Sequence, residues 1–428
     1  MVRSRWLAAL CMVAVTAGCG GSPGQARQAG QTATRQAGPT VVPTVMPRSG
    51  QSGRAGRTAE IWLDRLQMTS ASTGWALRWT VNPSSTQAGY LATARTTDGA
   101  RTWADVTPGA AIAMLETSGA TVVLDPLDGD RAYLAVTAET AEQSGAAPTV
   151  VFGTSDGGRT WTESARFRAP APVSLLSFAG PDDGWLVANY GGSMGQDPVW
   201  LYRTTDAGLR WSLVAATQPP GSGLPVDCGK AGLAFATAQV GWVTSFCNIA
   251  SADLVLVTRD SGVRWAPQAL PVLASGMCLG GCAAYGPPRF FGQWGFMVIG
   301  DAPGAPYLLV SSDLGQTWAR EPLPPGAGVY PRITFFGSRD GVLVSAGPSG
   351  VIGATLATTS DGGATWTTVR LGRSFTANGT EFDFVSQRTG FAWAPDGDAA
   401  GGPPAIDETT DSGRTWTSFV PVLANASG

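Results

Sequence analysis

The sequence contains no histidine among its 428 residues. Histidine is the commonest general base and metal ligand in proteins, so the usual starting point for either kind of site is missing. Charged residues make up only 14% of the chain, and the formal net charge is −3. A protein that binds nucleic acid by neutralising phosphates needs a surplus of basic residues, which this chain lacks. We therefore predict no cofactor, no metal site and no nucleic-acid partner.

The chain is also poor in lysine. Lys230 is its only lysine, and we attribute the preference for arginine to base composition rather than to chemistry. Turn-forming residues and tryptophan are abundant instead, with 57 Gly, 30 Pro and 16 Trp. This composition favours an all-β fold with many turns and an aromatic core. The length suggests two or three domains, unless repeated units extend a single core.

The N-terminus has the features of an export signal. Two arginines, Arg3 and Arg5, precede an apolar run from Trp6 to Ala17, which is shorter than the ~20 residues needed to span a bilayer. The run ends in Thr-Ala-Gly-Cys19, which resembles a bacterial lipobox, although Thr16 stands where leucine is usual. We predict a lipoprotein signal peptide over residues 1–18 and lipidation of Cys19. An ordinary cleaved signal is the alternative.

Residues 19–57 consist of the lipidated cysteine and a segment of Gly, Ala, Gln, Thr, Ser and Pro with scattered arginine. The segment has no hydrophobic periodicity and cannot bury a core, so we predict a disordered tether that spans roughly 30–40 Å. The expected location is extracytoplasmic, lipid-anchored to the bacterial cell membrane, and the expected state is a monomer.

Export implies an oxidising compartment, in which an even set of cysteines indicates disulfides. The mature domain has four, which allow three pairings: Cys228, Cys247, Cys278 and Cys282. We favour Cys228–Cys247 and Cys278–Cys282, because residues 232–235 and 241–245 have the pattern of one hairpin whose register brings position 228 opposite position 247. A zinc site is the alternative, although CxxxC without histidine is a weak metal signature.

One motif, Thr/Ser-x-Asp-x-Gly-x-Thr/Arg-Trp, recurs seven times at intervals of 48 to 58 residues. A single copy departs from it, with Ala100 where the others have glycine. Copies at such a regular period indicate structural repeats. The aspartates are Asp98, Asp156, Asp206, Asp260, Asp313, Asp361 and Asp411, and the tryptophans are Trp103, Trp161, Trp211, Trp265, Trp318, Trp366 and Trp416.

The residue types of this motif suit a closed hairpin turn. The aspartate can accept hydrogen bonds from N–H groups of its own turn, the glycine permits a left-handed backbone, and the tryptophan begins the next strand and packs in the core. Catalytic or calcium-binding aspartates are the alternative. A second element, Gly-aromatic followed by apolar residues, precedes most copies, as at Gly74 and Gly184. Each repeat thus predicts four short strands, as in a propeller blade.

The pairing of the two elements resembles the BNR/Asp-box repeat superfamily, and is most similar to its photosystem II stability and assembly factor-like branch. The resemblance covers residues 58 to 422. It implies a single seven-bladed β-propeller over residues 58–428, with four antiparallel strands per blade and the Asp box in the turn between strands three and four. The same boxes occur in sialidases and xyloglucan hydrolases, so the motif identifies a fold rather than a function. The expected blades cover residues 58–108, 120–168, 172–217, 230–272, 283–325, 330–373 and 380–423.

In such a blade the Asp-box turn and the first turn lie on one face, and the loops between strands two and three lie on the other. Several of these loops are long, and loops on a rigid scaffold commonly carry binding residues. We expect any ligand on that face, although each candidate residue has a plain structural alternative as a solvated loop residue or a capping aromatic. The candidates are Trp79, Tyr190, Asn248, Asp301, Trp393 and Asp396.

The expected function is a non-catalytic binding or assembly scaffold for an envelope protein or polysaccharide, because no catalytic residues can be identified. A sialidase-like glycoside hydrolase is the alternative. It would need a triad of arginines near the axis, and Arg289 and Arg332 occupy similar positions in adjacent repeats. The nearest match to the sialidase motif Phe-Arg-Ile-Pro is Tyr-Pro-Arg332-Ile, in which the proline is misplaced.

Overall fold

The computed structural model describes residues 61–424, apart from residues 81–88, 118, 139–145, 191–196, 218–222, 226–227, 248–253, 272–281, 302–305, 328, 347–351, 374, 376–379 and 395–404. The predicted signal peptide, Cys19 and the tether lie outside these residues.

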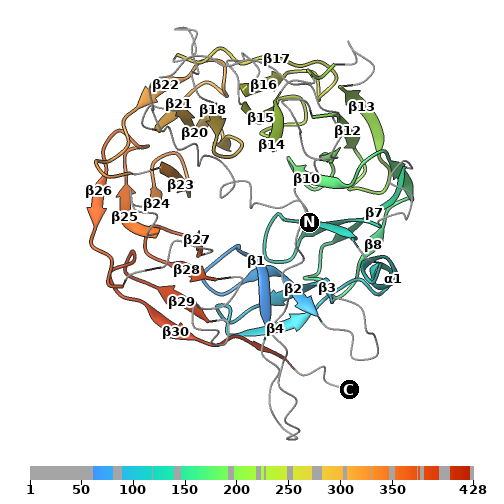
Figure 1. Cartoon of the computed structure of the whole chain (residues 1–428), viewed down its shortest axis with the longest axis horizontal. Coiled ribbons are helices and arrows are strands. Elements are labelled where there is room, and N and C mark those ends of the chain that lie inside the picture. The colour runs from blue at the N-terminus through green and yellow to red at the C-terminus, as the bar shows by residue number, and fades with distance from the viewer. Residues whose placement is uncertain are drawn as a thin grey trace, which may run out of the picture. The chain divides into compact units, whose positions relative to one another are not determined.

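The described residues form antiparallel sheets that are arranged around a ring (Figure 1). Each blade has four strands in sequence order, with the first strand nearest the axis, and the nine-stranded sheet contains blades four and five. The predicted all-β, seven-bladed propeller is confirmed. Blade one is β1 (Trp62–Met68), β2 (Gly74–Thr80), β3 (Tyr90–Thr96) and β4 (Thr102–Asp105); blade two is β5 (Thr121–Pro126), β6 (Ala132–Thr137), β7 (Ala147–Thr154) and β8 (Thr162–Glu163); blade three is β10 (Val173–Phe178), β11 (Gly184–Asn189), β12 (Val199–Thr204) and β13 (Ser212–Ala216); and blade four is β14 (Gly229–Phe235), β15 (Gly241–Cys247), β16 (Val255–Thr258) and β17 (Ala266–Pro267). Blade five is β19 (Arg289–Phe291), β20 (Trp294–Asp301), β21 (Tyr307–Ser311) and β22 (Ala319–Glu321); blade six is β23 (Val329–Phe335), β24 (Gly341–Ala346), β25 (Ile352–Thr359) and β26 (Thr367–Val369); and blade seven is β27 (Glu381–Phe384), β28 (Gly390–Trp393), β29 (Ile406–Thr409) and β30 (Thr417–Phe419).

Three further strands add to this plan. β9 (Phe167–Ala169) pairs with β7, and β18 (Cys282–Ala284) pairs with both β15 and β20, which joins blades four and five. β31 (Val422–Leu423) pairs in parallel with β4 of blade one. The last two residues of the approximate range predicted for blade seven therefore extend the sheet of blade one.

Helix is almost absent from the described residues. A single α-helical turn, α1 (Ile112–Leu115), follows a 3₁₀ turn at Gly109–Ala111 in the connection between blades one and two. Within the described part of the chain, no helix has the length and apolar character needed to cross a membrane.

The Gly-aromatic element explains how neighbouring blades pack. Trp185 on β11 stacks on Phe235 of the next blade with 3.5 Å between ring centroids, and Trp265 meets the same phenylalanine edge-on at 6.1 Å. A Cβ atom at Gly241, the glycine of blade four, would lie 2.4 Å from the Phe235 ring, so only glycine fits there. The same stacking recurs between other blades, in Tyr133–Phe178, Trp242–Phe290 and Phe296–Phe335.

The hairpin predicted around the cysteines is confirmed. β14 and β15 pair antiparallel with Gly229 opposite Phe246 and Lys230 opposite Ser245, so the next pair outward is position 228 with position 247. Cys228 is disulfide-bonded, which is incompatible with a thiolate ligand of zinc at this position. Its partner is not among the described side chains, so the pairings Cys228–Cys247 and Cys278–Cys282 stay predictions; Cys278 itself lies outside the described residues.

Candidate functional site

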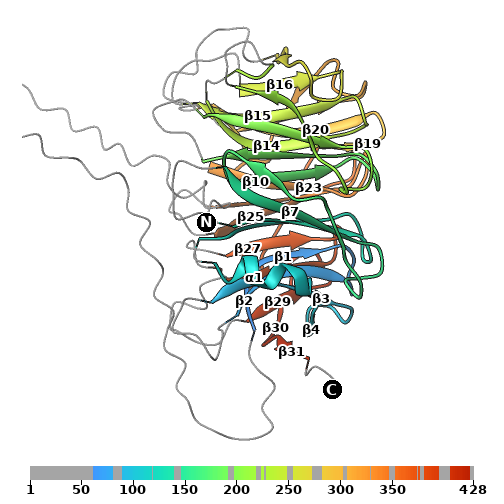
Figure 2. The same ribbon diagram turned by 90° about the vertical axis from the view of Figure 1, so that its right-hand side faces the viewer.

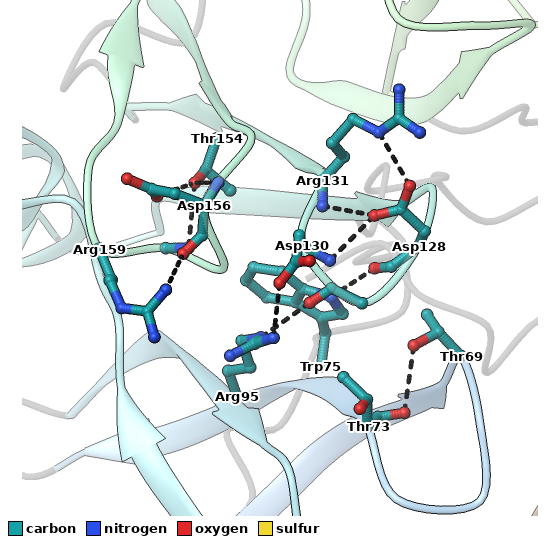
Figure 3. Close-up of polar contacts among 12 residues, drawn as sticks. Thr69, Thr73, Trp75, Arg95, Asp128, Asp130, Arg131, Thr154, Asp156 and Arg159 are labelled. Carbon is teal, nitrogen blue, oxygen red and sulfur yellow. Dashed lines mark hydrogen bonds and ion pairs between the residues drawn. The ribbon is translucent and has the colours of Figure 1, made fainter.

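The Asp boxes occupy the turns between strands three and four, and Figure 3 shows the box of blade two. Asp156 accepts hydrogen bonds on Oδ1 from the Thr154 hydroxyl and the Thr160 N–H (2.9 Å each), and on Oδ2 from the Thr160 hydroxyl (2.6 Å). The threonine hydroxyl and then the main-chain N–H hold the pKa of Asp156 down to about 2, and the pKa values of Asp313 and Asp361 are lowered to about 2 in the same way. Both oxygens of the carboxylate thus accept hydrogen bonds within the turn, as expected for a residue that closes a hairpin turn.

The two residues after each box aspartate adopt the left-handed backbone. Gly157 and Gly158 have φ of 75° and 81°, and in blade one Gly99 and Ala100 have φ of 74° and 67°. Ala100, the residue that departs from the motif, therefore keeps the geometry of the other boxes. An alanine in this conformation costs on the order of 1 kcal/mol relative to glycine.

The predicted ligand face is the face opposite the boxes, and the structure places three of its candidates. Tyr190 follows β11 directly, exposes 55% of its surface, and donates a hydrogen bond from its hydroxyl to the carbonyl of Pro170 (2.8 Å). Trp79 is half-buried and packs against the core between blades one and two.

The expectation that Trp393 is available to a ligand is wrong. It is only 6% exposed and packs with Phe391 and Trp103 between blades seven and one, so it presents no ring to a ligand. Asn248 and Asp396 lie outside the described residues, and Asp301 is placed only through its backbone at the end of β20.

A buried polar network that the sequence did not predict lies next to Tyr190 in the chain. Asp197 is fully buried and accepts hydrogen bonds on Oδ2 from the Asn189 amide and from the main-chain N–H of Lys230, both at 2.8 Å. The Lys230 ammonium donates to the carbonyl of Cys228 at 2.9 Å, and burial raises the pKa of Asp197. These bonds tie β11 and the start of β12 in blade three to β14 in blade four. The one sequence signal for this network is that Lys230 is the only lysine.

Two acidic side chains on the innermost strands, Asp125 on β5 and Asp383 on β27, hold neighbouring blades together; we call them the axial aspartates. Each accepts a hydrogen bond from a main-chain N–H on the first strand of the following blade, Asp125 from Phe178 (3.1 Å) and Asp383 from Met68 (2.5 Å). These N–H groups lie on sheet edges and have no ladder partner there. Burial raises the pKa of both aspartates to about 7, against the opposing charges of Arg65 and Arg289.

The two arginines of the hydrolase alternative have different surroundings. Arg332 donates two hydrogen bonds to the carboxylate of Glu381 on the adjacent blade. Arg289 lies over the ring of Phe291 at 5.5 Å; burial lowers its pKa, and the charge of Asp383 opposes that shift. The Arg332 guanidinium is therefore held by Glu381, whereas Arg289 is exposed and donates no hydrogen bond among the described residues. Among the described side chains, no group of three or more acidic or cysteine residues could hold a metal ion.

No protein-family model matches the sequence, and no curated protein matches it. Solved structures similar to this chain include YCF48 bound to a D1 peptide, at 18% identity over 78% of this chain and 88% of that chain, with a TM-score of 0.45. They also include the GH74 enzyme of Niastella koreensis, at 14% identity over 83% of this chain and 62% of the enzyme, with a TM-score of 0.36. An α-L-arabinanase of Penicillium chrysogenum complexed with arabinobiose is 14% identical over 68% of this chain and 94% of that chain, with a TM-score of 0.36. The chain thus spans less than two thirds of the GH74 enzyme, and likeness at these identities concerns the fold alone.

Proposed function

We propose that this propeller is a non-catalytic binding or assembly scaffold for a protein or polymer of the cell envelope. In this proposal the lipidated Cys19 anchors it on the outer side of the cell membrane, and the partner binds on the face that carries the loops between strands two and three. YCF48, one of the structures similar to this chain, was solved bound to a D1 peptide.

The observation that carries the proposal is the position of Tyr190. It is an aromatic ring with 55% of its surface exposed, and the hydrogen bond to Pro170 fixes its orientation. An exposed and already oriented tyrosine contributes a large contact area to a partner while losing little conformational entropy on binding.

The support beneath this residue is rigid. Asn189, its neighbour in the chain, is 2% exposed and is held by the fully buried Asp197, which also accepts the N–H of Lys230. Buried hydrogen bonds of this kind fix the end of a strand more tightly than a free loop would be fixed. Tyr190 therefore projects from a fixed point at the end of β11, which suits recognition of a partner by a rigid surface.

The axial charges support a structural rather than a catalytic role. The axial aspartates are hydrogen-bonded to the following blade, and Arg332 is bound to Glu381. Groups engaged in this way stabilise the ring of blades.

The test is capture of partners from native envelopes by the full-length chain. Tyr190→Ala should reduce the recovered partner at least tenfold, whereas Tyr190→Phe, which loses only the hydroxyl, should reduce it by a smaller factor. Leu213→Ala is the matched control, because Leu213 is 53% exposed on the outer strand of the same blade. Equal recovery with wild type and Tyr190→Ala would reject this face as the binding surface, and release of sugar from the envelopes would favour the hydrolase alternative.

A further inference from the structure

Blade five has a different first turn from the other blades. In blades one, three and four, for example, five residues separate the first strand from the second, whereas only Gly292 and Gln293 separate β19 from β20. The hairpin continues to the pair Phe291–Trp294, and Gly292 has a φ of 60°, which a tight two-residue turn requires. Trp294 stands at the end of this short turn, on the Asp-box face, because the turn is bonded to the Asp-box turn through the Leu314 N–H and the Gln293 carbonyl. Figure 2 shows the two strands that the turn joins, β19 and β20.

Trp294 is exposed, unlike the tryptophans of the core. Its relative exposure is 43%, and Trp294 and Tyr190 are the large aromatic residues that stand out as exposed in the described part of the chain. The core indoles of Trp75, Trp185 and Trp265 each donate an N–H to a backbone carbonyl. The indole N–H of Trp294 has no partner among the described residues, so both its ring face and its donor are accessible.

The neighbouring Asp-box turn brings Leu314 beside this tryptophan. The Leu314 N–H donates to the carbonyl of Gln293 (2.9 Å), so the two turns lie side by side. Leu314 has a φ of 57°, a left-handed backbone that disfavours a side chain of its size. The equivalent position in the other boxes holds glycine, alanine or serine. Because the backbone of this turn disfavours leucine, we expect the Leu314 side chain to serve a contact outside the turn.

The surface formed by these two turns carries no net charge, because the Asp313 carboxylate is offset by the Arg259 guanidinium, which donates to the Gly315 carbonyl (3.3 Å). Gln293, Trp294 and Gln316 are exposed. The carboxylate of Asp313 is held by the Ser311 and Thr317 hydroxyls and by the Thr317 N–H within its own turn. The same turn of blade two, by contrast, carries Asp128, Asp130 and Arg131 (Figure 3).

We infer that Trp294, Gln293, Leu314 and Gln316 form a binding site for a neutral hexose polysaccharide on the Asp-box face, separate from the proposed partner face. The C–H groups of a pyranose ring pack on the face of an indole, and the indole N–H hydrogen-bonds a sugar hydroxyl. The amides of the two glutamines provide both donors and acceptors for further hydroxyls. A surface with no net charge gives an anionic polymer no net attraction, which is why the ligand class is neutral.

The test is affinity electrophoresis of the full-length chain in native gels that contain soluble β-glucan, α-mannan or galactan, with polygalacturonate as an anionic polymer. At least one neutral polymer should retard the wild-type chain, and Trp294→Ala should weaken that retardation at least tenfold. Leu314→Gly should weaken it several-fold while the melting temperature stays equal or rises, because glycine accepts the left-handed backbone. Tyr190→Ala should leave retardation unchanged.

Three results would overturn the inference: no retardation by any neutral polymer, retardation by polygalacturonate alone, or retardation of Trp294→Ala within twofold of wild type. Because Tyr190 and Trp294 lie on opposite faces, loss of the envelope partner with Tyr190→Ala and loss of polysaccharide with Trp294→Ala are separate outcomes. Failure of one leaves the other measurable.

Discussion

Replacement of the axial aspartates by asparagine should stabilise the propeller at alkaline pH. Asp125 and Asp383 are half-buried, and burial raises their pKa to about 7 from an ordinary value of 3.8. A carboxyl group whose pKa is higher in the folded chain binds its proton more tightly there. The stability that this contributes is therefore fully present below pH 3.8 and is lost as the pH rises through about 7.

The size of the effect can be worked from the pKa rise. A shift of about three units at about 1.4 kcal/mol per unit gives about 4 kcal/mol for each residue as an upper value. Asparagine is neutral at every pH and keeps an oxygen that can accept the N–H of Phe178 or Met68. Each variant should match wild type near pH 3.5, exceed it by about 1–2 kcal/mol at pH 5 and exceed it by about 2–4 kcal/mol at pH 8, with the lower figures if solvent at these half-buried side chains screens part of the effect.

The assay is guanidinium unfolding followed by circular dichroism at pH 3.5, 5, 6, 7 and 8. Asp182→Asn, an exposed position in the turn between β10 and β11, controls for the change in net charge. A free energy of unfolding that falls below wild type at pH 8 in Asp125→Asn would refute the reasoning. It would mean that the ionised carboxylate stabilises the fold through Arg65 more than its burial destabilises it.

Two further predictions concern the repeat elements. Gly241→Ala should lower the free energy of unfolding by about 1–3 kcal/mol, because its Cβ would lie 2.4 Å from the Phe235 ring. Guanidinium unfolding measures this change. The control is Gly180→Ala, where an added Cβ meets nothing within 4 Å, and an equal loss in that variant would contradict the prediction. Asp361→Ala should lower the melting temperature at pH 7 and have little effect near pH 2. A carboxylate whose pKa is lowered to about 2 contributes stability that is present above pH 3.8 and is lost as the pH falls towards 2. Thermal melts across this range measure the difference, and a difference that does not change with pH would contradict the view that the ionised Asp361 closes its turn.

The repeats could be predicted from the sequence because their chemistry is local. Asp156 and the residues that bond to it lie within a few positions of one another, so a short motif contains the whole turn. The register of β14 and β15 also results from a local hairpin pattern. Ala100 departs from the motif in sequence, yet it adopts the same left-handed backbone, because a short side chain tolerates that conformation at a modest cost.

The contacts between blades could not be predicted, because they join residues that no local pattern relates. Asp383 bonds to Met68 across 315 positions, and Asp197 bonds to the Lys230 N–H across 33. Trp393 was expected on the ligand face because it lies next to a loop between strands two and three. It is buried because blade seven packs against blade one as the ring closes. Exposure of Trp294 depends in the same way on a first turn that is shorter in blade five than in blades one, three and four.

The measurement that tests the central claim most directly is saturable retention of the full-length chain on isolated native envelopes, with sugar and peptide release into the supernatant measured in the same samples. A binding scaffold predicts retention that saturates, falls at least tenfold with Tyr190→Ala and is unchanged with Leu213→Ala, while release stays at the level of a heat-denatured control. Release that increases with time and with the amount of protein would contradict the claim and identify the propeller as an enzyme.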